Sequence, residues 1–327
     1  MSANTTPTPE MNDDMRGRVS ARCMHNTATG PTVMEAVSPT IAPSHISEII
    51  LQRNKLFFKV CVLKNVIFGT KIFIMDFQST KALLDERYEK FAVPSFVEND
   101  PVQIPHSFSR KEDIEISGFF ASMIAWGNRK MIINNAKRFM QLMDNAPYDF
   151  VMNFEERDLK PLDAAVHRTF NGDDMRFFVR SLANIYRNHG GLESVFCKFP
   201  EMDKNLMNVH SVLFEISHET RNMRHISDIT KGSAAKRLNM FLRWMVRDDG
   251  RGIDFGLWKG ISPADLLIPL DVHCGRCARD LGLLSRNQND WKAVLELTGN
   301  LRKFDPTDPI KYDFALFGSG VTQTPML

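Results

Sequence analysis

The feature that most constrains this chain is the spacing of its apolar residues after Met75. In most segments these residues recur every three or four positions, which is the period of an α-helix that buries one face. Runs that alternate apolar and polar residues, as half-buried strands do, are scarce. The pattern therefore predicts an all-α fold. The expected helices span residues 78–91, 114–126, 130–143, 174–188, 205–218, 233–246 and 290–301, with a last one near 309–317.

Residues 92–108 interrupt this pattern. They contain Pro94, Pro101 and Pro105, and a proline cannot donate the backbone hydrogen bond that a helix interior requires. We therefore expect an extended segment there rather than an α-helix.

The first 74 residues differ in composition from the rest of the chain. Residues 1 to about 45 are rich in Thr, Pro, Ser, Asn and Met without periodicity, which is typical of disorder. Residues 56–74 are apolar but contain three lysines, which disfavours a membrane-spanning helix. We expect residues 1–74 to be either a genuine, poorly ordered extension or upstream sequence read in frame, with the biological start at Met75. Residues 75–327 would then form a single helical domain.

Charge and cysteine content exclude two broad classes of protein. The chain has 41 Lys and Arg residues against 39 Asp and Glu residues, a balance that argues against a protein that coats nucleic acid without specificity. Five cysteines in 327 residues are too few for a disulfide framework. We expect a cytoplasmic protein without a membrane anchor, a monomer that needs no cofactor.

Basic residues gather between Arg221 and Arg247, where seven Arg and Lys side chains accompany a single acidic residue. Such a surface suits phosphate contacts, and a solvated helix face is the alternative interpretation. Within this stretch Gly232, Ser233 and Ala234 form a turn of small residues before a helix. Backbone N–H groups at a helix start bind phosphate well, although the turn can equally be an ordinary helix start with Ser233 as the N-cap.

Asp271 stands where the helix after Pro269 is expected to begin. Aspartate is a favoured N-cap, because its side chain accepts hydrogen bonds from free backbone N–H groups and its charge complements the helix dipole. The same N–H groups would hold the carboxylate in place, which a catalytic carboxylate also needs. The sequence therefore allows Asp271 to be a cap, a catalytic group or both.

The residues around Asp271 resemble a known signature. Leu-Asp-Val-His at 270–273, followed by Arg276, Arg279 and Leu-Gly-Leu at 281–283, is similar to the Val-Asp-(Thr/Val)-His...Arg...Arg-Leu-Gly-Leu motif of the helix-hairpin-helix DNA glycosylases. This superfamily includes the endonuclease III and archaeal oxoguanine glycosylase types. The chain from Met75 to about Val321 also resembles an uncharacterised conserved bacterial family of helical proteins.

Two further segments resemble parts of the same superfamily. Residues 232–238 are similar to its hairpin, Gly-x-Gly-x-Lys-Thr-Ala, and residues 312–320 to its closing apolar helix before a glycine. The resemblance places Asp271 on the catalytic aspartate and Lys236 on the lysine of the lyase members. Lys231 is the alternative candidate for that lysine.

The resemblance implies a base-excision enzyme that acts on double-stranded DNA. The damaged nucleotide is flipped out of the helix, Asp271 stabilises the cationic sugar, and Lys236 attacks C1′ to form a Schiff base. The elimination that follows would nick the strand. The residues expected to contact the nucleic acid are Lys231, Gly232, Ser233, Ala234, Arg237, Arg243, His273 and Arg276.

Two other motifs allow a functional and a structural interpretation. Trp126, Asn128 and Arg129 could form the stacking and hydrogen-bonding wall of a base pocket, or could end the preceding helix. Cys274 and Cys277 form a C-x-x-C pair without a second pair, so we expect no metal and two partly buried free thiols.

Two alternatives to the enzyme remain open at this point. One is a non-catalytic helical module that binds nucleic acid through the same hairpin. The other is a structural or protein-interaction domain in which Asp271 is only a helix cap.

Overall fold

The computed structural model describes residues 76–326, which all belong to one compact unit, Ile72–Leu327. Every regular element in this range is a helix, and only two isolated β-bridges occur. The expected all-α class is therefore confirmed for the described residues. The expectations for residues 1–74 and for a start at Met75 lie outside them.

The α-helices follow the predicted periodicity, with ends that shift by a few residues and two additional short helices, α5 and α7. They are α2 (Phe77–Phe91), α3 (Lys111–Met123), α4 (Arg129–Leu142), α5 (Pro147–Asn153), α6 (Gly172–Asn188), α7 (Leu192–Phe196), α8 (Met202–Leu213), α9 (Lys236–Val246), α10 (Val272–Asp280), α11 (Trp291–Phe304) and α12 (Tyr312–Thr322).

Short 3-10 helices connect them. These are η1 (Pro94–Asn99), η2 (Pro101–Gln103), η3 (Pro105–Ser107), η4 (Glu156–Ala164), η5 (Asn222–His225), η6 (Ile229–Lys231), η7 (Pro263–Asp265) and η8 (Pro309–Lys311).

Residues 92–108 are not extended, which corrects the sequence expectation. Pro94, Pro101 and Pro105 each open one of the 3-10 helices η1 to η3. A proline is well tolerated at the first position of a helix, because the N–H that it lacks would have no partner there. The prolines therefore prevent an α-helix, as expected, but they begin tight turns rather than an extended strand.

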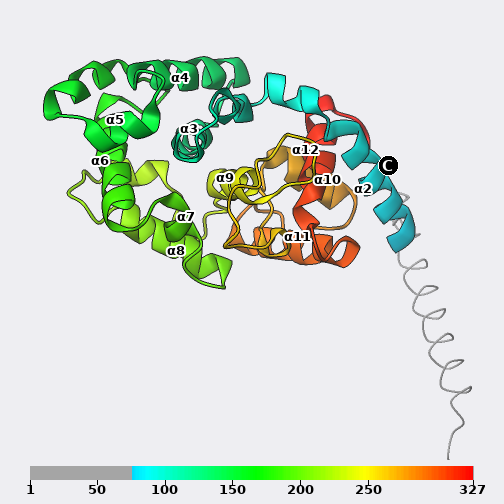
Figure 1. The fold of residues 1–327 in the computed structure, drawn as a ribbon. Coiled ribbons are helices and arrows are strands. Elements are labelled where there is room, and N and C mark those ends of the chain that lie inside the picture. Colours follow the sequence, from blue (N-terminus) through cyan, green and yellow to red (C-terminus); the bar gives the residue numbers. More distant parts are fainter. Residues whose placement is uncertain (1–75, 327) are drawn as a thin grey trace, which may run out of the picture. The chain divides into compact units, whose positions relative to one another are not determined.

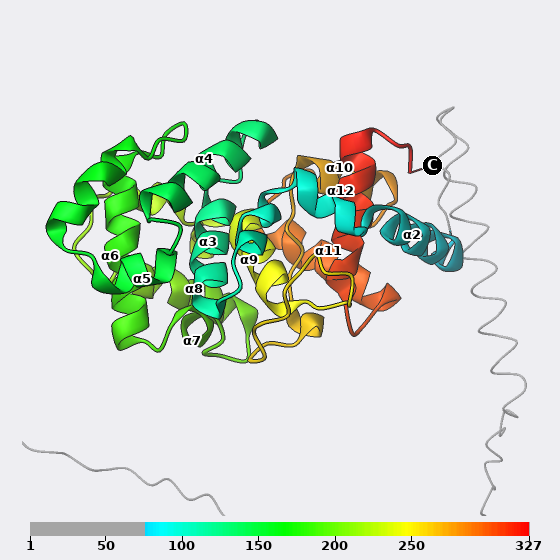
Figure 2. The same ribbon diagram turned by 45° about the horizontal axis from the view of Figure 1, so that its top comes forward.

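The helices form two groups, which Figure 1 and Figure 2 show from two directions. Helices α3 to α8 make up one group, and α10 to α12 together with α2 make up the other. Helix α9 lies between the groups and packs against α3, while α12 packs against both α2 and α10. The chain between α8 and α9 thus passes from the first group to the second.

Helix α3 is the buried central helix that the sequence predicts. All its residues from Ile114 to Met123 are buried. Ser117 and Ser122 donate to backbone carbonyls of the same helix, whereas the buried Glu115 accepts from Tyr186 and Trp258, which lie on other segments. A β-carbon on Gly118 would lie 3.3 Å from atoms of two α9 side chains, so the absence of a side chain there lets α9 pack closely.

Helix α12 depends on two glycines for its packing. A β-carbon on Gly318 would lie 2.3 Å from the ring of Phe91 on α2, and one on Gly320 would lie 2.8 Å from Cβ of His273 on α10. Either contact is shorter than van der Waals separation allows, so only glycine fits at these positions. Close packing of α10 against α12 fixes the position of the residue before α10, Asp271.

Among residues 76–326, no helix combines the length and the apolar character required to cross a bilayer. Within the same range, no cluster of three or more His, Cys, Asp or Glu side chains is arranged to hold a metal ion.

Candidate functional site

A cleft of about 660 Å³ lies between the two helix groups. Its walls come mainly from the segment before α3, the turn between α3 and α4, the hairpin before α9, the start of α10 and helix α12. The volume lies within the range of about 300–1,000 Å³ that is usual for small-ligand sites. Segments far apart in the sequence therefore meet around one space.

Lys236 and Asp271 meet in this cleft. Lys236 is the first residue of α9, Asp271 directly precedes α10, and Lys236 Nζ lies 3.4 Å from Asp271 Oδ2. The lysine side chain is 32% exposed and the aspartate side chain 13% exposed. The structure thus brings together two residues that the sequence separates by 35 positions, and leaves both accessible from the cleft.

The two carboxylate oxygens of Asp271 have different partners. Oδ1 accepts hydrogen bonds of 2.9 Å from the backbone N–H groups of His273 and Cys274, so Asp271 is the N-cap of α10. Oδ2 lies on the side of Lys236. Capping consequently fixes the carboxylate without using the oxygen that approaches the lysine.

Lys231 lies apart from this pair. Its side chain is 73% exposed, it forms an ion pair of 3.0 Å with Asp228, and it is not among the residues that line the cleft. Of the two lysines that the sequence leaves open, the geometry therefore favours Lys236 as the partner of Asp271.

The hairpin before α9 is held in an unusual backbone conformation. Gly232 and Ala235 both have left-handed geometry, with φ of +83° and +47°. The loop is secured from outside, because Asn239 donates to the Ala234 carbonyl at 3.2 Å and Trp291 N–H donates to the Gly232 carbonyl at 3.0 Å. Ser233 also forms an isolated antiparallel β-bridge with Asp290, so the loop pairs with the segment before α11. Gly232, Ser233 and Ala234 all line the cleft.

Arg237 and Arg243 do not form the basic surface that the sequence suggests. Arg237 donates to the Met123 carbonyl at the end of α3, and burial lowers the pKa of its guanidinium to about 10. Arg243 is only 4% exposed and pairs with Asp254 and Asp313. Burial favours loss of the Arg243 charge, but the two carboxylates outweigh it and raise its pKa. Arg237 is thus held by one backbone carbonyl and Arg243 by two carboxylates, and both residues contribute to the lining of the cleft.

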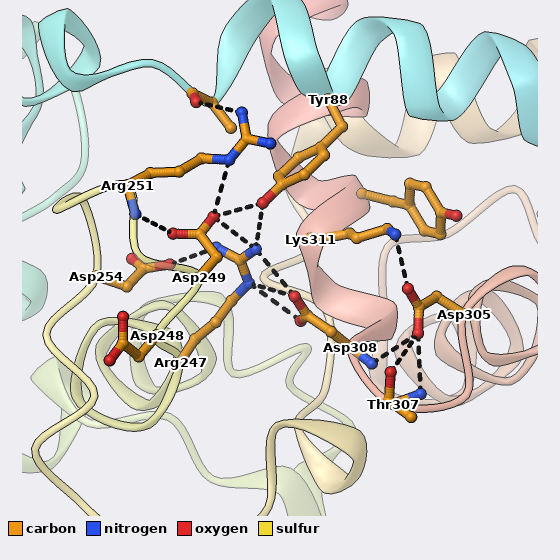
Figure 3. Close-up of polar contacts among 12 residues, drawn as sticks. Tyr88, Arg247, Asp248, Asp249, Arg251, Asp254, Asp305, Thr307, Asp308 and Lys311 are labelled. Atoms are coloured by element: carbon orange, nitrogen blue, oxygen red, sulfur yellow. Dashed lines mark hydrogen bonds and ion pairs between the residues drawn. The ribbon is translucent and has the colours of Figure 1, made fainter.

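The last arginine of the predicted basic stretch is also internal. Figure 3 shows Arg247 surrounded by the carboxylates of Asp249, Asp254 and Asp308 and the hydroxyl of Tyr88. Its Nε lies 2.9 Å from Asp308 Oδ2, and the residue is 1% exposed. The network joins α9 to α2 and to the segment before α12. These charges therefore stabilise the second helix group rather than bind a ligand.

The residues expected to line a base pocket are divided between two roles. Trp126 and Arg129 line the cleft. The guanidinium of Arg168 lies 4.5 Å from the centre of the Trp126 ring, and that of Arg129 lies 5.6 Å from the ring of Phe317. Asn128 caps α4 by accepting from Met131 N–H at 3.1 Å and is not part of the lining.

His273 and Arg276 both contact the carbonyl oxygen of Gly320 on α12. His273 lines the cleft and its Nδ1 lies 3.2 Å from this oxygen, whereas Arg276 donates to the same oxygen at 2.8 Å from outside the cleft. The pair thus secures α10 against α12, and only His273 can reach a ligand in the cleft.

Cys274 and Cys277 are free thiols, as the sequence suggests, and both are buried. Cys274 donates to Asp313 Oδ1 at 3.2 Å. Burial, reinforced by the charge of Asp313, raises the pKa of Cys274 well above its usual range, and burial also raises that of Cys277. The pair therefore belongs to the core beneath the cleft and lacks the thiolate character of a redox site.

Asp100 is a cleft residue that the sequence analysis missed. It is 7% exposed and lines the cleft just before η2. Burial raises the pKa of its carboxyl group, while the nearby charges of Arg243, Arg129 and Lys236 act in the opposite direction. Its position before Pro101 is the only signal in the sequence, and that signal indicates a helix cap rather than a ligand-binding residue.

Comparison with known proteins identifies a family. One family match spans residues 100–322, which is more than half of the chain. The chain belongs to this family, Protein of unknown function (DUF2400). The DUF2400 match includes every residue that lines the cleft except Phe96.

No curated protein and no solved structure matches the chain. Membership of DUF2400 carries no activity with it, so any likeness to the helix-hairpin-helix glycosylases rests on the motif residues and on the cleft in which they lie.

Proposed function

We propose that this protein excises damaged bases from double-stranded DNA and cleaves the strand at the resulting abasic site, with Lys236 as the nucleophile. The observation that carries the proposal is the distance of 3.4 Å between Lys236 Nζ and Asp271 Oδ2 inside the cleft. A carboxylate held beside a lysine amine can act as the general base that frees the amine for nucleophilic attack. The fold implied is that of the helix-hairpin-helix glycosylases.

The two side chains have complementary tasks in this reaction. The amine of Lys236 attacks C1′ of the extruded nucleotide, so that the Nζ–C1′ bond forms while the bond from C1′ to the base breaks. The base leaves with the electron pair. The negative charge of Asp271 first stabilises the positive charge that develops on C1′ as the base leaves. Oδ2 then accepts the proton that Lys236 loses once the Nζ–C1′ bond has formed. The C1′–O4′ bond then opens, and O4′ takes up a proton, which gives the Schiff base. Removal of a proton from C2′ expels the 3′ phosphate with its electron pair and cleaves the strand.

The surroundings of the pair suit an extruded nucleotide. The cleft of about 660 Å³ can hold one nucleoside, whose glycosidic bond is inaccessible in stacked DNA. Gly232, Ser233 and Ala234 bring small residues of the hairpin to the cleft wall, where a phosphate beside the lesion can approach the backbone closely. Trp126 and Arg129 provide flat groups at the cleft wall against which a base can stack.

Two other functions are compatible with the same fold. A non-catalytic DNA-binding module would use the hairpin and the cleft without a reactive lysine. A structural or protein-interaction domain would use Asp271 only as the N-cap of α10. The enzyme accounts for an additional observation, because neither alternative requires the second oxygen of Asp271 to face Lys236.

Borohydride trapping of the full-length chain on a labelled duplex with an abasic site tests the proposal. We expect a covalent adduct that disappears in Lys236→Gln and persists in Lys231→Gln, the matched control five residues away. An adduct that persists in Lys236→Gln and disappears in Lys231→Gln would contradict the assignment of the nucleophile. A folded wild-type protein that binds the duplex but forms no covalent adduct would favour the non-catalytic DNA-binding module.

A further inference from the structure

Asp100 has an unpaired carboxylate oxygen in the cleft. Its Oδ1 accepts a hydrogen bond of 3.0 Å from Val102 N–H, which makes it the N-cap of η2. Within residues 76–326 no hydrogen bond reaches its Oδ2, and this oxygen is not one of the fully buried polar atoms that lack a partner, so it is accessible. The residue is 7% exposed, and because it lines the cleft, this remaining exposure is to the space in which a ligand would lie.

The fold leaves the second oxygen of Asp100 open to a ligand. Apolar side chains line the same cleft, among them Phe96, Ile132 and Met240, beside the cations of Arg129 and Lys236. Helix capping needs only Oδ1, and the ion pairs of the second helix group do not include Asp100. Oδ2 is therefore a hydrogen-bond acceptor at the cleft that neither the cap nor an ion pair uses.

We propose that Asp100 selects the base to be excised, with Oδ2 accepting a hydrogen bond from a ring N–H on that base. This inference rests on the proposed function and adds a specificity-determining residue to it. The class of ligand is a nucleobase with a ring N–H on its pairing edge. A site built around such a hydrogen bond discriminates strongly against an analogue that lacks the donor, because the acceptor is then buried without a partner.

Base release from paired duplexes tests the inference. The probes are duplexes with uracil and 3-methyluracil, hypoxanthine and 1-methylhypoxanthine, and 8-oxoguanine and 1-methyl-8-oxoguanine, because methylation removes the ring N–H in each pair. For the base that wild-type protein excises, we expect release from the methylated partner to be about 10- to 100-fold slower. In Asp100→Ser this difference should fall to less than about threefold.

Two variants separate the loss of the hydrogen bond from a loss of folding and from a change in side-chain volume. Serine at position 100 retains an N-cap oxygen for η2 but lacks the second acceptor. Asp100→Asn retains the side-chain volume but places an N–H donor where Oδ2 accepts. We expect this variant to release the unmethylated base about 10- to 100-fold more slowly. Because the volume is unchanged, such an effect would be due to the hydrogen bond and not to lost packing. Asp76→Asn, at the exposed N-cap of α2 outside the cleft, is the matched control and should behave as wild type.

Trapping on an abasic duplex, which has no base to recognise, distinguishes the ways in which the inference can fail. Equal release of both members of each pair by wild-type protein would overturn it. It would also be overturned if Asp100→Ser still discriminated between the two members of a pair as strongly as the wild type does. The same holds if both variants lost base release and trapping to the same extent, or if the wild-type protein trapped abasic DNA but released no base. A wild-type protein that traps nothing would overturn the proposed function itself.

Discussion

Lys236 approaches Asp271 through the one carboxylate oxygen that helix capping leaves free. Asp271 Oδ1 accepts from two backbone N–H groups of α10, and Oδ2 lies 3.4 Å from Lys236 Nζ. The lysine opens α9, which packs on the first helix group, and the aspartate opens α10 in the second. A single carboxylate therefore caps a helix through one oxygen and faces the proposed nucleophile through the other.

Replacement of Asp271 by asparagine should separate these two roles. Asparagine is an equally good N-cap, so we expect little change in thermal midpoint. It cannot take a proton from Lys236 or offset positive charge, so adduct formation should slow by about 10²- to 10³-fold. Thermal melting and trapping kinetics check the two effects. An unchanged trapping rate in this variant would indicate that Asp271 is only a cap.

The helices were predictable from sequence, but the pairing of Lys236 with Asp271 was not predictable from periodicity. A period of three to four residues identifies a helix and its buried face, as in α3, but does not show which helix packs against which. The two residues were placed together by the resemblance of short motifs around residues 232–238 and 270–283. Their proximity in the structure is an observation independent of that resemblance.

Gly320 should be intolerant of a side chain. An alanine β-carbon there would lie 2.8 Å from Cβ of His273 and 3.0 Å from its carbonyl oxygen, so α10 would have to move away from α12. We expect Gly320→Ala to lower the free energy of unfolding by about 1–3 kcal/mol and to slow trapping, because Asp271 moves with α10. Urea denaturation and trapping kinetics measure both.

Gly299 on α11 is the matched control for that substitution. No atom lies within 4 Å of its added β-carbon, so Gly299→Ala should stabilise the protein by about 0.5–1 kcal/mol through helix propensity alone. Equal effects at the two glycines would contradict the close contact between α10 and α12.

Arg247 should be essential for stability. Substitution by methionine would leave Asp254, whose side chain is 0% exposed, without one of its two arginine partners. We expect Arg247→Met to cost about 3–5 kcal/mol, because an uncompensated buried charge remains. Arg157→Met, at a side chain that is 79% exposed beside Glu155, should change little. Similar urea midpoints for both variants would show that the buried network is dispensable.

The thiol of Cys197 should make stability depend on pH in the alkaline range. Burial, together with the charges of Glu193 and Glu115, raises the pKa of this thiol to about 12, from an ordinary value of 9.0. The folded state therefore keeps the proton longer than the unfolded chain. The resulting stabilisation is present below pH 9 and is lost as the pH rises from 9 towards 12.

Comparison of wild type with Cys197→Ala isolates this effect, because other groups titrate equally in both. The difference in free energy of unfolding between wild type and variant should be constant below pH 9. Above pH 9 the wild type should lose stability relative to Cys197→Ala. A difference that is constant up to pH 11 would show that the thiol ionises equally in the folded and unfolded states.

Two parts of the site could not be predicted from sequence, for physical reasons. Arg243 and Arg247 lie one helical turn apart and look like a solvated basic face. Asp254 in the loop after α9 and the distant Asp308 and Asp313 pair with them in the interior. Charge along a helix does not reveal such partners. Asp100 becomes a cleft residue only because η2, which it caps, packs against α3 and α4, and no local pattern indicates that packing.

The most direct test of the proposed mechanism is identification of the residue that borohydride links to an abasic duplex. Digestion of the trapped full-length protein, followed by mass spectrometry of the DNA-linked peptide, locates the modified amine without relying on a variant. The account predicts that the sugar is attached to Nζ of Lys236. Attachment at Lys231 or at another amine, or a folded protein that forms no adduct, would contradict it.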